Sequence, residues 1–298
     1  MSGGPIAYIV GLYPAVSHTF IHREIEALRA RGVDVRTVSL RRTPTEQLLT
    51  EADRAEAART WTVLPPKPAE VVRAHGRALV RGPGAYVRAL RLALRTGPGG
   101  MRPTLWQLFY FLEAVLIHDR LRDEGVRHVH AHFANSASWV AMLVAELDGP
   151  SGMSWSFTMH GPTEFDDVTR YALAEKARSA AFVACIGDYC RSQLMKLTPR
   201  EAWDRFVVVR CGVDTERFAP AMNGDRPPAR AAGDPLRVLS VGRLVPDKGQ
   251  GVLVEAVGLL RDRGMNGRFD PTVLPGDAME LVGAARRPKT LLYYDGGP

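Results

Sequence analysis

Cysteine is scarce in this sequence, with Cys185, Cys190 and Cys211 as the three among 298 residues. Three cysteines at unmatched spacing are not typical of a disulfide framework. They also lack the Cys-x-x-Cys spacing of a zinc site, so we expect them to be structural thiols. Long apolar runs are also missing, since none reaches the roughly 18 residues of a membrane-spanning helix. The first residues lack the charged region and cleavage site of a signal peptide, so we expect a cytoplasmic protein.

Acidic residues are outnumbered by basic ones, 32 against 39, which gives a net charge of +7. Such an excess suits nucleic acid, an anionic membrane or a phosphorylated substrate. We expect no nucleic-acid partner, because no binding motif or aromatic stacking array accompanies the charge. Glu70 to Arg95 is an arginine-rich segment that could associate peripherally with an anionic inner membrane face, although an ordinary surface helix explains it too. Its arginines are Arg73, Arg77, Arg81, Arg88, Arg91 and Arg95.

The chain also lacks the phosphate-binding fingerprints Gly-x-x-x-x-Gly-Lys-Ser/Thr and Gly-x-Gly-x-x-Gly. What it has is alternation of strand and helix patterns. Ile6 to Leu12 predicts a strand, Phe20 to Arg31 a helix capped by Thr19, and Val33 to Leu40 a second strand. Glu70 to Arg95 predicts a helical stretch broken near Gly82, and Thr104 to Glu124 a long helix.

The same alternation continues to about residue 218. Further strands are predicted at Val126–Phe133, Ser154–Met159, Ala181–Ile186 and Phe206–Val209, and helices at Ser136–Leu147, Tyr171–Ser179 and Tyr189–Leu197. This pattern predicts an α/β, doubly wound, Rossmann-like domain over residues 1–218. Residues 219–235 have a linker composition, and 236–264 start a second strand-turn-helix unit. The tail, residues 265–298, shows no clear strand run.

Three polar residues follow the first predicted strand: Ser17, His18 and Thr19. In open α/β sheets ligands bind at the carboxyl ends of the strands, so these side chains could bind sugar hydroxyls. The alternative is a helix cap next to a packing residue, Phe20.

A second candidate follows another strand, at Thr158-Met159-His160-Gly161. A histidine before glycine at a strand end can face a cleft with little steric cover, and could hydrogen-bond a sugar hydroxyl or transfer a proton. Glu164 is a polar neighbour in the cleft on this interpretation, and part of a charged loop on the alternative one.

Three histidines, His128, His130 and His132, alternate along one predicted strand and share a face. Same-face side chains two apart lie about 7 Å from each other, too far for adjacent metal ligands. We therefore expect packing and no metal, with His132 as a possible cleft residue because it is nearest the carboxyl end.

The strand at Leu236 to Val241 leads into a turn with Gly242, Arg243, Lys248 and Gly249. Two cations and the amides at the start of the following helix suit a diphosphate. The alternative is an exposed basic turn.

Together these motifs resemble the family-4 glycosyltransferases with the GT-B fold, most closely their exopolysaccharide members of the colanic-acid biosynthesis kind. The segments that carry the resemblance are Pro14-x-x-Ser17-x-Thr19-Phe20-Ile21-x-x-Glu24-Ile25, His130-Ala131-His132-Phe133, Thr158-x-His160-Gly161, Cys211-Gly212-Val213-Asp214-x-x-Arg217-Phe218-x-Pro220 and Val241-Gly242-Arg243-Leu244-x-x-x-Lys248-Gly249. Their order and spacing over about 260 residues are specific.

The resemblance implies an acceptor-binding first domain and a second domain that binds a UDP- or GDP-linked sugar. It implies transfer with retention to a lipid-linked or polysaccharide acceptor in cell-surface polysaccharide synthesis. Arg243 and Lys248 would hold the diphosphate in place of a metal cofactor, and His160 would touch the donor sugar.

Two departures from that family stand out. His18 occupies a position where such proteins often have Glu, and the paired glutamates of the donor site are missing, because Pro288 stands where the partner of Glu280 would fall. We therefore expect a truncated or frameshifted product. The alternative function is a catalytically inactive remnant or an acceptor-binding module.

Overall fold

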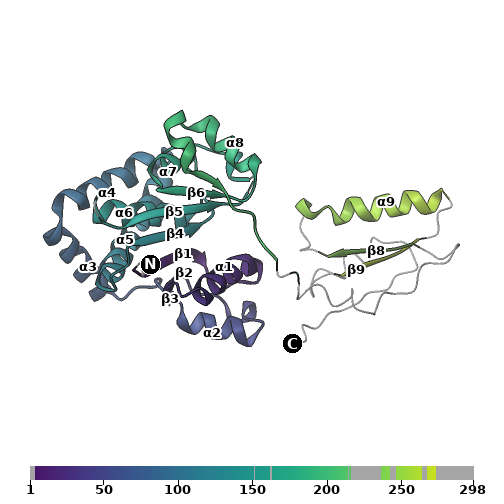
Figure 1. Cartoon of the computed structure of the whole chain (residues 1–298), viewed down its shortest axis with the longest axis horizontal. Helices are drawn as coiled ribbons and strands as arrows, with labels where there is room; N and C mark the ends of the chain where they lie inside the picture. The colour runs from purple at the N-terminus through teal and green to yellow at the C-terminus, as the bar shows by residue number, and fades with distance from the viewer. Residues whose placement is uncertain are drawn as a thin grey trace. The chain divides into compact units, whose positions relative to one another are not determined.

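The computed structural model describes residues 4–150, 152–161, 163–213, 215, 236–241, 246–263 and 267–272. The chain divides into two compact units, Met1–Val213 and Asp214–Pro298. Each unit is built from strands and helices that alternate along the chain (Figure 1).

The first unit is organised around one seven-stranded sheet with the order β3-β2-β1-β4-β5-β6-β7. Every neighbouring pair of strands is parallel. The strands are β1 (Ile6–Leu12), β2 (Val35–Arg41), β3 (Trp61–Thr62), β4 (His128–His132), β5 (Ser154–Met159), β6 (Phe182–Cys185) and β7 (Phe206–Val208). The predicted doubly wound α/β sheet is confirmed.

Helices connect these strands. They are α1 (Thr19–Ala30), α2 (Glu51–Arg59), α3 (Pro68–Arg81), α4 (Pro83–Thr96), α5 (Met101–Asp123), α6 (Ser136–Asp148), α7 (Leu173–Ser179) and α8 (Asp188–Leu197). Short 3₁₀ turns are η1 (Val16–His18), η2 (Thr45–Gln47), η3 (Thr163–Phe165) and η4 (Arg200–Arg205).

The core lies on both faces of the sheet, because side chains of β1 alternate between them. Ala7 and Ile9 join a buried cluster with residues of α4, α5 and α6 on one face. Tyr8 and Val10 join a second cluster with Ile25 of α1 on the other face. Burial on both faces explains why these strands read as apolar runs.

The order of the strands fixes the position of a ligand site. The chain leaves β1 toward β2 and β3, and returns through α3, α4 and α5 to β4, which pairs with the other side of β1. The order therefore reverses between β1 and β4. Ligands of open α/β sheets bind beside the carboxyl ends of the strands at such a reversal.

Several local expectations need correction. Thr19 is the first residue of α1 and does not cap it, since the capping position is His18 and no side chain bonds the helix end there. The long helix begins at Met101, three residues before the predicted start. Helix α2 and strand β3 were not predicted; α2 starts at a capping box in which Thr50 and Asp53 bond each other's backbone. The break near Gly82 is confirmed, because α3 and α4 meet there.

The second unit contains β8 (Leu236–Val241), η6 (Pro246–Lys248) and α9 (Gln250–Asp262), which confirms the predicted strand-turn-helix. Strand β9 (Gly267–Thr272) pairs in parallel with β8. The expectation of no strand after Gly264 was therefore wrong. Phe269 is the one large apolar residue of β9, so backbone pairing rather than an apolar pattern defines this strand. The predicted linker at 219–235, with Glu280 and Pro288, lies outside the described residues, and the domain boundaries stay predictions.

Candidate functional site

Three loops meet at the carboxyl edge of the first sheet, where the strand order reverses. They follow β1, β4 and β5, which are neighbours in the sheet. The β1 loop carries His18, β4 ends in His132, and His160 comes directly after β5. The structure therefore brings together three of the residues that the sequence singled out, from three separate segments of the chain.

His132 and His160 form the centre of this site. His132 Nδ1 lies 2.8 Å from His160 Nε2, and the His132 side chain is fully buried. The rings of Phe20 and Phe133 pack against His160 with centroids 4.6 and 4.7 Å away. Burial, with a smaller contribution from His18, lowers the pKa of His160 to about 4. Burial likewise lowers the pKa of His132 well below 6.5, so both imidazoles are neutral at pH 7, where one donates a hydrogen bond to the other.

Glu24, on α1, extends the pair. Tyr8 Oη donates a 2.6 Å hydrogen bond to Glu24 Oε1, and that oxygen lies 3.8 Å from His132 Nε2. Burial raises the pKa of the Glu24 carboxyl. The structure thus aligns Tyr8, Glu24, His132 and His160 in one polar series, although no hydrogen bond joins Glu24 to His132 Nε2.

This series favours one arrangement of protons. A proton on His132 Nε2 faces the Glu24 carboxylate, which attracts it. His132 Nδ1 then accepts from the Nε2–H of His160, and Nδ1 of His160 is left as a hydrogen-bond acceptor. A neutral acceptor at the carboxyl edge of the sheet suits a sugar hydroxyl.

Three residues have the spacing of a metal site, because ligand atoms of Glu24, His130 and His132 lie within 4.8 Å of one another. The two histidine rings are 5.2 Å apart between centroids, closer than the spacing along the strand suggested. Both ring nitrogens of His130 are already engaged, at 2.7 Å from Ser156 Oγ and 2.9 Å from Thr158 Oγ1. Binding an ion would break one of these bonds, and the expectation of no metal stays a prediction.

Glu164 braces two of the three loops. Its Oε1 accepts a 2.8 Å hydrogen bond from the Ala134 amide, after β4, and its Oε2 a 3.1 Å bond from the Gly161 amide, after β5. A Cβ at Gly161 would lie 2.7 Å from Glu164 Oε2, so a larger residue there would displace this carboxylate. Glu164 is buried. The contacts make it a positioning residue for His160, while its role as a sugar ligand stays a prediction.

Lys176 on α7 also supports the turn after β4, and no sequence pattern singled it out. It is fully buried on α7, donates a 2.8 Å hydrogen bond from Nζ to the Ala134 carbonyl, and lies 4.2 Å from the centroid of the Trp139 ring. Burial lowers its pKa well below the usual value, and the charge of Glu164 opposes that shift. A buried lysine between polar loops is visible only once the loops are assembled.

In the first loop, His18 is half-buried, whereas Ser17 and Thr19 are exposed. His18 Nδ1 donates a 2.9 Å hydrogen bond to the Leu12 carbonyl, which leaves Nε2 as an acceptor. Its ring lies 5.6 Å from that of Phe133, so His18 belongs to the histidine site. Sugar binding by Ser17 and Thr19 stays a prediction.

Of the predicted diphosphate turn, Gly242 and Arg243 lie outside the described residues. Lys248 is exposed at the end of η6. Gly249 follows with a φ of +68°, a conformation that favours glycine, directly before α9. The lysine thus stands next to a helix N-terminus, as the sequence indicated.

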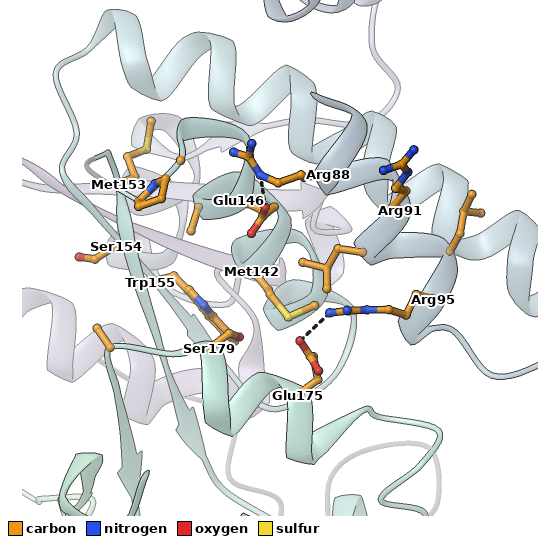
Figure 2. Close-up of a pocket in the computed structure, with 16 residues that line it drawn as sticks. Arg88, Arg91, Arg95, Met142, Glu146, Met153, Ser154, Trp155, Glu175 and Ser179 are labelled. Atoms are coloured by element: carbon orange, nitrogen blue, oxygen red, sulfur yellow. Dashed lines mark hydrogen bonds and ion pairs between the residues drawn. The ribbon is translucent and has the colours of Figure 1, made fainter. Parts of the chain in front are cut away.

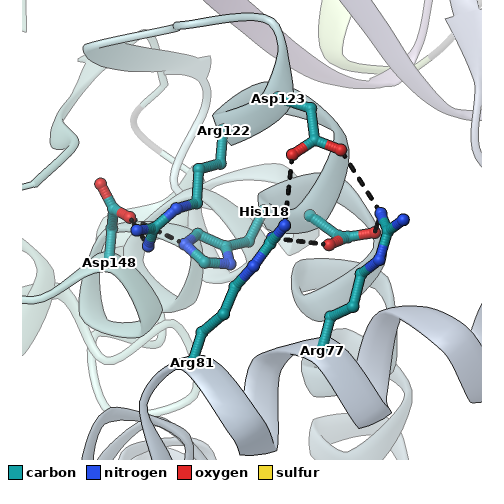
Figure 3. Close-up of polar contacts among 7 residues, drawn as sticks. Arg77, Arg81, His118, Arg122, Asp123 and Asp148 are labelled. Atoms are coloured by element: carbon teal, nitrogen blue, oxygen red, sulfur yellow. Dashed lines mark hydrogen bonds and ion pairs between the residues drawn. The ribbon is translucent and has the colours of Figure 1, made fainter.

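The arginine-rich helices α3 and α4 form ion pairs with other helices of the first unit. Arg77 and Arg81 of α3 pair with Asp119 and Asp123 of α5 at 3.0 to 3.5 Å (Figure 3). In the same region His118 and Arg122 contact Asp148 of α6 at 3.0 and 3.1 Å. These charges hold helices together and are largely neutralised, which favours the surface-helix interpretation of this segment.

A pocket of about 870 Å³ beside α4 shows the same neutralisation (Figure 2). Arg88 pairs with Glu146 at 3.0 Å and Arg95 with Glu175 at 2.9 Å along its walls. Ser154, at the start of β5, also lines this pocket, which therefore opens at the amino edge of the sheet, away from the histidine site.

Comparisons with known proteins place this fold. No family model matches the chain. A segment of 85 residues is 36% identical to the putative colanic acid biosynthesis glycosyltransferase WcaL of Escherichia coli K12, and it covers 28% of this chain and 19% of that protein. The match therefore spans about a fifth of the curated relative.

Solved structures match over nearly the whole chain. A glycosyltransferase from Rickettsia africae gives a TM-score of 0.55 at 13% identity, covering 98% of this chain and 69% of that one. The lipopolysaccharide outer core galactosyltransferase WaaB gives 0.56 at 12%, covering 94% and 64%. A UDP-GlcNAc 2-epimerase from Neisseria meningitidis, bound to UDP-GlcNAc, gives 0.53 at 8%, covering 98% and 73%. The chain has the α/β fold of GT-B glycosyltransferases, as predicted; membership of family 4 stays a prediction.

Among the described residues, no helix combines the length and apolar character that crossing a bilayer requires. The expected cytoplasmic location stays a prediction.

Proposed function

We propose that this protein transfers a sugar from a nucleotide-sugar to a lipid-linked or polysaccharide acceptor in cell-surface polysaccharide synthesis, with retention of configuration. The observation that carries the proposal is the neutral His132–His160 pair at the carboxyl edge of the sheet, where the strand order reverses. A neutral imidazole suits an uncharged sugar, because it binds hydroxyls without a counter-ion.

Each residue has a defined part in the proposed reaction. His160 accepts a hydrogen bond from a hydroxyl of the donor sugar through Nδ1. His132 and Glu24 hold that ring in the required tautomer, and Glu164 holds the loop. Arg243 and Lys248 bind the diphosphate and stabilise its charge as it leaves, so no metal enters the proposal.

The likeness to WcaL supports sugar transfer in polysaccharide synthesis, but the fold does not by itself separate transfer from epimerisation, because a UDP-GlcNAc 2-epimerase shares it. The products separate them. A transferase releases a nucleoside diphosphate and forms a glycoside, whereas an epimerase returns an altered nucleotide-sugar.

A second candidate is an acceptor-binding module without transfer activity, or an inactive remnant. The completeness of the first unit favours it: the seven-stranded sheet and its two core clusters are built by residues 1–213 alone. This unit could hold an acceptor without a donor.

A titration calorimetry panel tests the proposal. The purified chain is titrated with UDP- and GDP-sugars, and the variants Arg243→Ala and Lys248→Ala are compared with Arg200→Ala, an exposed cation on η4. The proposal predicts binding to at least one donor, weakened by about tenfold or more in the first two variants only. A folded protein that binds no donor would support the module instead.

A further inference from the structure

A second cavity at the carboxyl edge carries chemistry that the histidine site does not use. It measures about 770 Å³ and lies between α5, the start of α6 and the loop after β5. Arg41, Arg102 and Arg170 line it. Aromatic rings share its wall, from Trp106, Tyr110, Trp139 and Tyr171.

The three arginines differ from those of α3 and α4. None of them forms an ion pair within the part of the chain that the structure describes, although Arg41 acts electrostatically on the Glu113 carboxyl, whereas Arg77, Arg81, Arg88 and Arg95 are all paired. Asp167, the acidic residue of the lining, accepts a 3.0 Å hydrogen bond from the Arg170 amide. Three cations against one such carboxylate leave a net positive cavity, which favours an anion with several oxygens, such as a phosphate.

Gln107 adds a second requirement. It lines the cavity, is only 3% exposed, and its Oε1 has no hydrogen-bond partner among the residues described. A buried carbonyl oxygen without a donor is costly unless a ligand supplies one. A phosphate offers acceptors to the arginines. Gln107 Oε1 itself is closed to solvent, so a rotation of the side chain is needed before a ligand hydroxyl donates to it. Sugar rings also stack on aromatic side chains such as those lining this wall.

The mouth of the cavity continues into an exposed apolar stripe, defined here as Met101, Leu105, Trp106, Leu108, Phe109 and Leu112 of α5. Trp106 belongs to both features. Met101, Leu105, Leu108 and Leu112 follow one helix face, and these side chains are between 37% and 91% exposed. Exposed apolar surface of this continuity marks contact with an apolar partner.

We propose that this cavity binds the phosphate-linked sugar of a lipid-linked acceptor, with the lipid chain lying along the stripe of α5. The proposal rests on the proposed function and narrows its acceptor from two classes to one. Charge complementarity selects the phosphate, the aromatic rings select the sugar, and the adjoining stripe selects a lipid over a free polysaccharide.

Vesicle flotation with the full chain tests this. The vesicles are phosphatidylcholine alone, phosphatidylcholine with phosphatidylglycerol, and phosphatidylcholine with polyprenyl phosphate at the same charge. We expect the polyprenyl phosphate vesicles to bind at least about tenfold more tightly than the phosphatidylglycerol vesicles. The variant Arg102→Gln/Arg170→Gln should lose that preference. Arg73→Gln/Arg91→Gln removes the same charge from exposed arginines without a described carboxylate partner and should keep it.

Titration with glucose 1-phosphate tests the cavity separately from the apolar stripe. Tryptophan fluorescence reports the binding. The variant Leu105→Ser/Phe109→Ser should lose vesicle binding but still bind glucose 1-phosphate. Val72→Ser/Val80→Ser, which changes residues on α3 that are 74% and 85% exposed, should retain both. If the protein bound glucose 1-phosphate but no vesicle, the proposed binding of a lipid chain along α5 would be refuted.

Equal binding of both anionic vesicles, lost equally in the two arginine variants, would show general charge attraction and overturn the proposal. No donor sugar is present in these assays. A protein that binds polyprenyl phosphate but no nucleotide-sugar would therefore contradict the proposed function alone, whereas the reverse result would contradict this inference alone.

Discussion

Replacing Glu164 by Gln should destabilise the first unit and loosen the loop that carries His160. The carboxylate accepts hydrogen bonds from two backbone amides, the buried one of Ala134 at 2.8 Å and the part-buried one of Gly161 at 3.1 Å, which link the turns after β4 and β5. A glutamine has one acceptor oxygen, so its NH₂ group would face one of these N–H donors. Hydrogen bonds to a charged group contribute about 1.5–3 kcal/mol each, and an unsatisfied buried donor costs about 1–3 kcal/mol. We expect a loss of about 2–4 kcal/mol in the free energy of unfolding.

Urea unfolding followed by tryptophan fluorescence measures this loss selectively, because all five tryptophans lie within residues 1–213. The matched control is Asp166→Asn, which removes the same charge from an exposed position of the same loop and should change stability by less than about 0.5 kcal/mol. If the Glu164→Gln variant were as stable as this control, the proposed bracing of the two turns would be wrong.

Three further predictions follow from buried ionisable groups. Burial lowers the pKa of His160 to about 4 and of His130 to about 3, below the ordinary 6.5, so the stability that these neutral rings provide is complete above pH 6.5 and lost as the pH falls toward 4. Because Glu113 opposes this trend between pH 4.5 and 7, the measurement uses the Glu113→Gln variant. Its free energy of unfolding in urea should fall by about 1 kcal/mol per pH unit for each ring from pH 7 to 5, and a flat profile would contradict their neutrality. Burial raises the pKa of Glu113 to about 7, and its Oε2 has no hydrogen-bond partner among the described residues, so the wild type loses stability as the pH rises from 4.5 through 7. The free energy of unfolding of Glu113→Gln should therefore be about 1–3 kcal/mol higher than that of the wild type at pH 8, with no gain at pH 5. Cys211 is exposed and the other two thiols are buried, so a thiol reagent should label one cysteine in the native protein and three in urea; labelling of all three without urea would refute the packing of β6 and α8.

The fold of the first unit was largely predictable, because its strands are buried on both faces and read as apolar runs. Ile6–Leu12 and Ser154–Met159 have the bounds that their patterns indicated. Strand β3 has two residues and β9 a single large apolar one, so neither has a pattern to detect. Thr19 was assigned as a cap from its residue type, whereas the turn η1 before it places His18 there and starts the helix one residue early.

The site was predictable in position but not in its connections. Parallel strands bring their carboxyl ends together, and this rule alone placed His18, His132 and His160 near each other. The bond between His132 and His160, and the roles of Tyr8, Glu24 and Lys176, depend on which strands are neighbours, and the order of strands in a sheet leaves no trace in local sequence. The basic cavity under α5 likewise joins segments that are separate in the chain.

The neutral pair His132–His160 is proposed to bind the sugar of a nucleotide-sugar. The direct measurement is calorimetric titration of the wild type and of His160→Ala. The ligands are the UDP- or GDP-sugar that the wild type binds and the corresponding nucleoside diphosphate alone. We expect the wild type to bind the nucleotide-sugar more tightly than the diphosphate, and His160→Ala to lose this difference while binding the diphosphate unchanged. An undiminished preference for the sugar in His160→Ala would show that His160 does not bind the sugar.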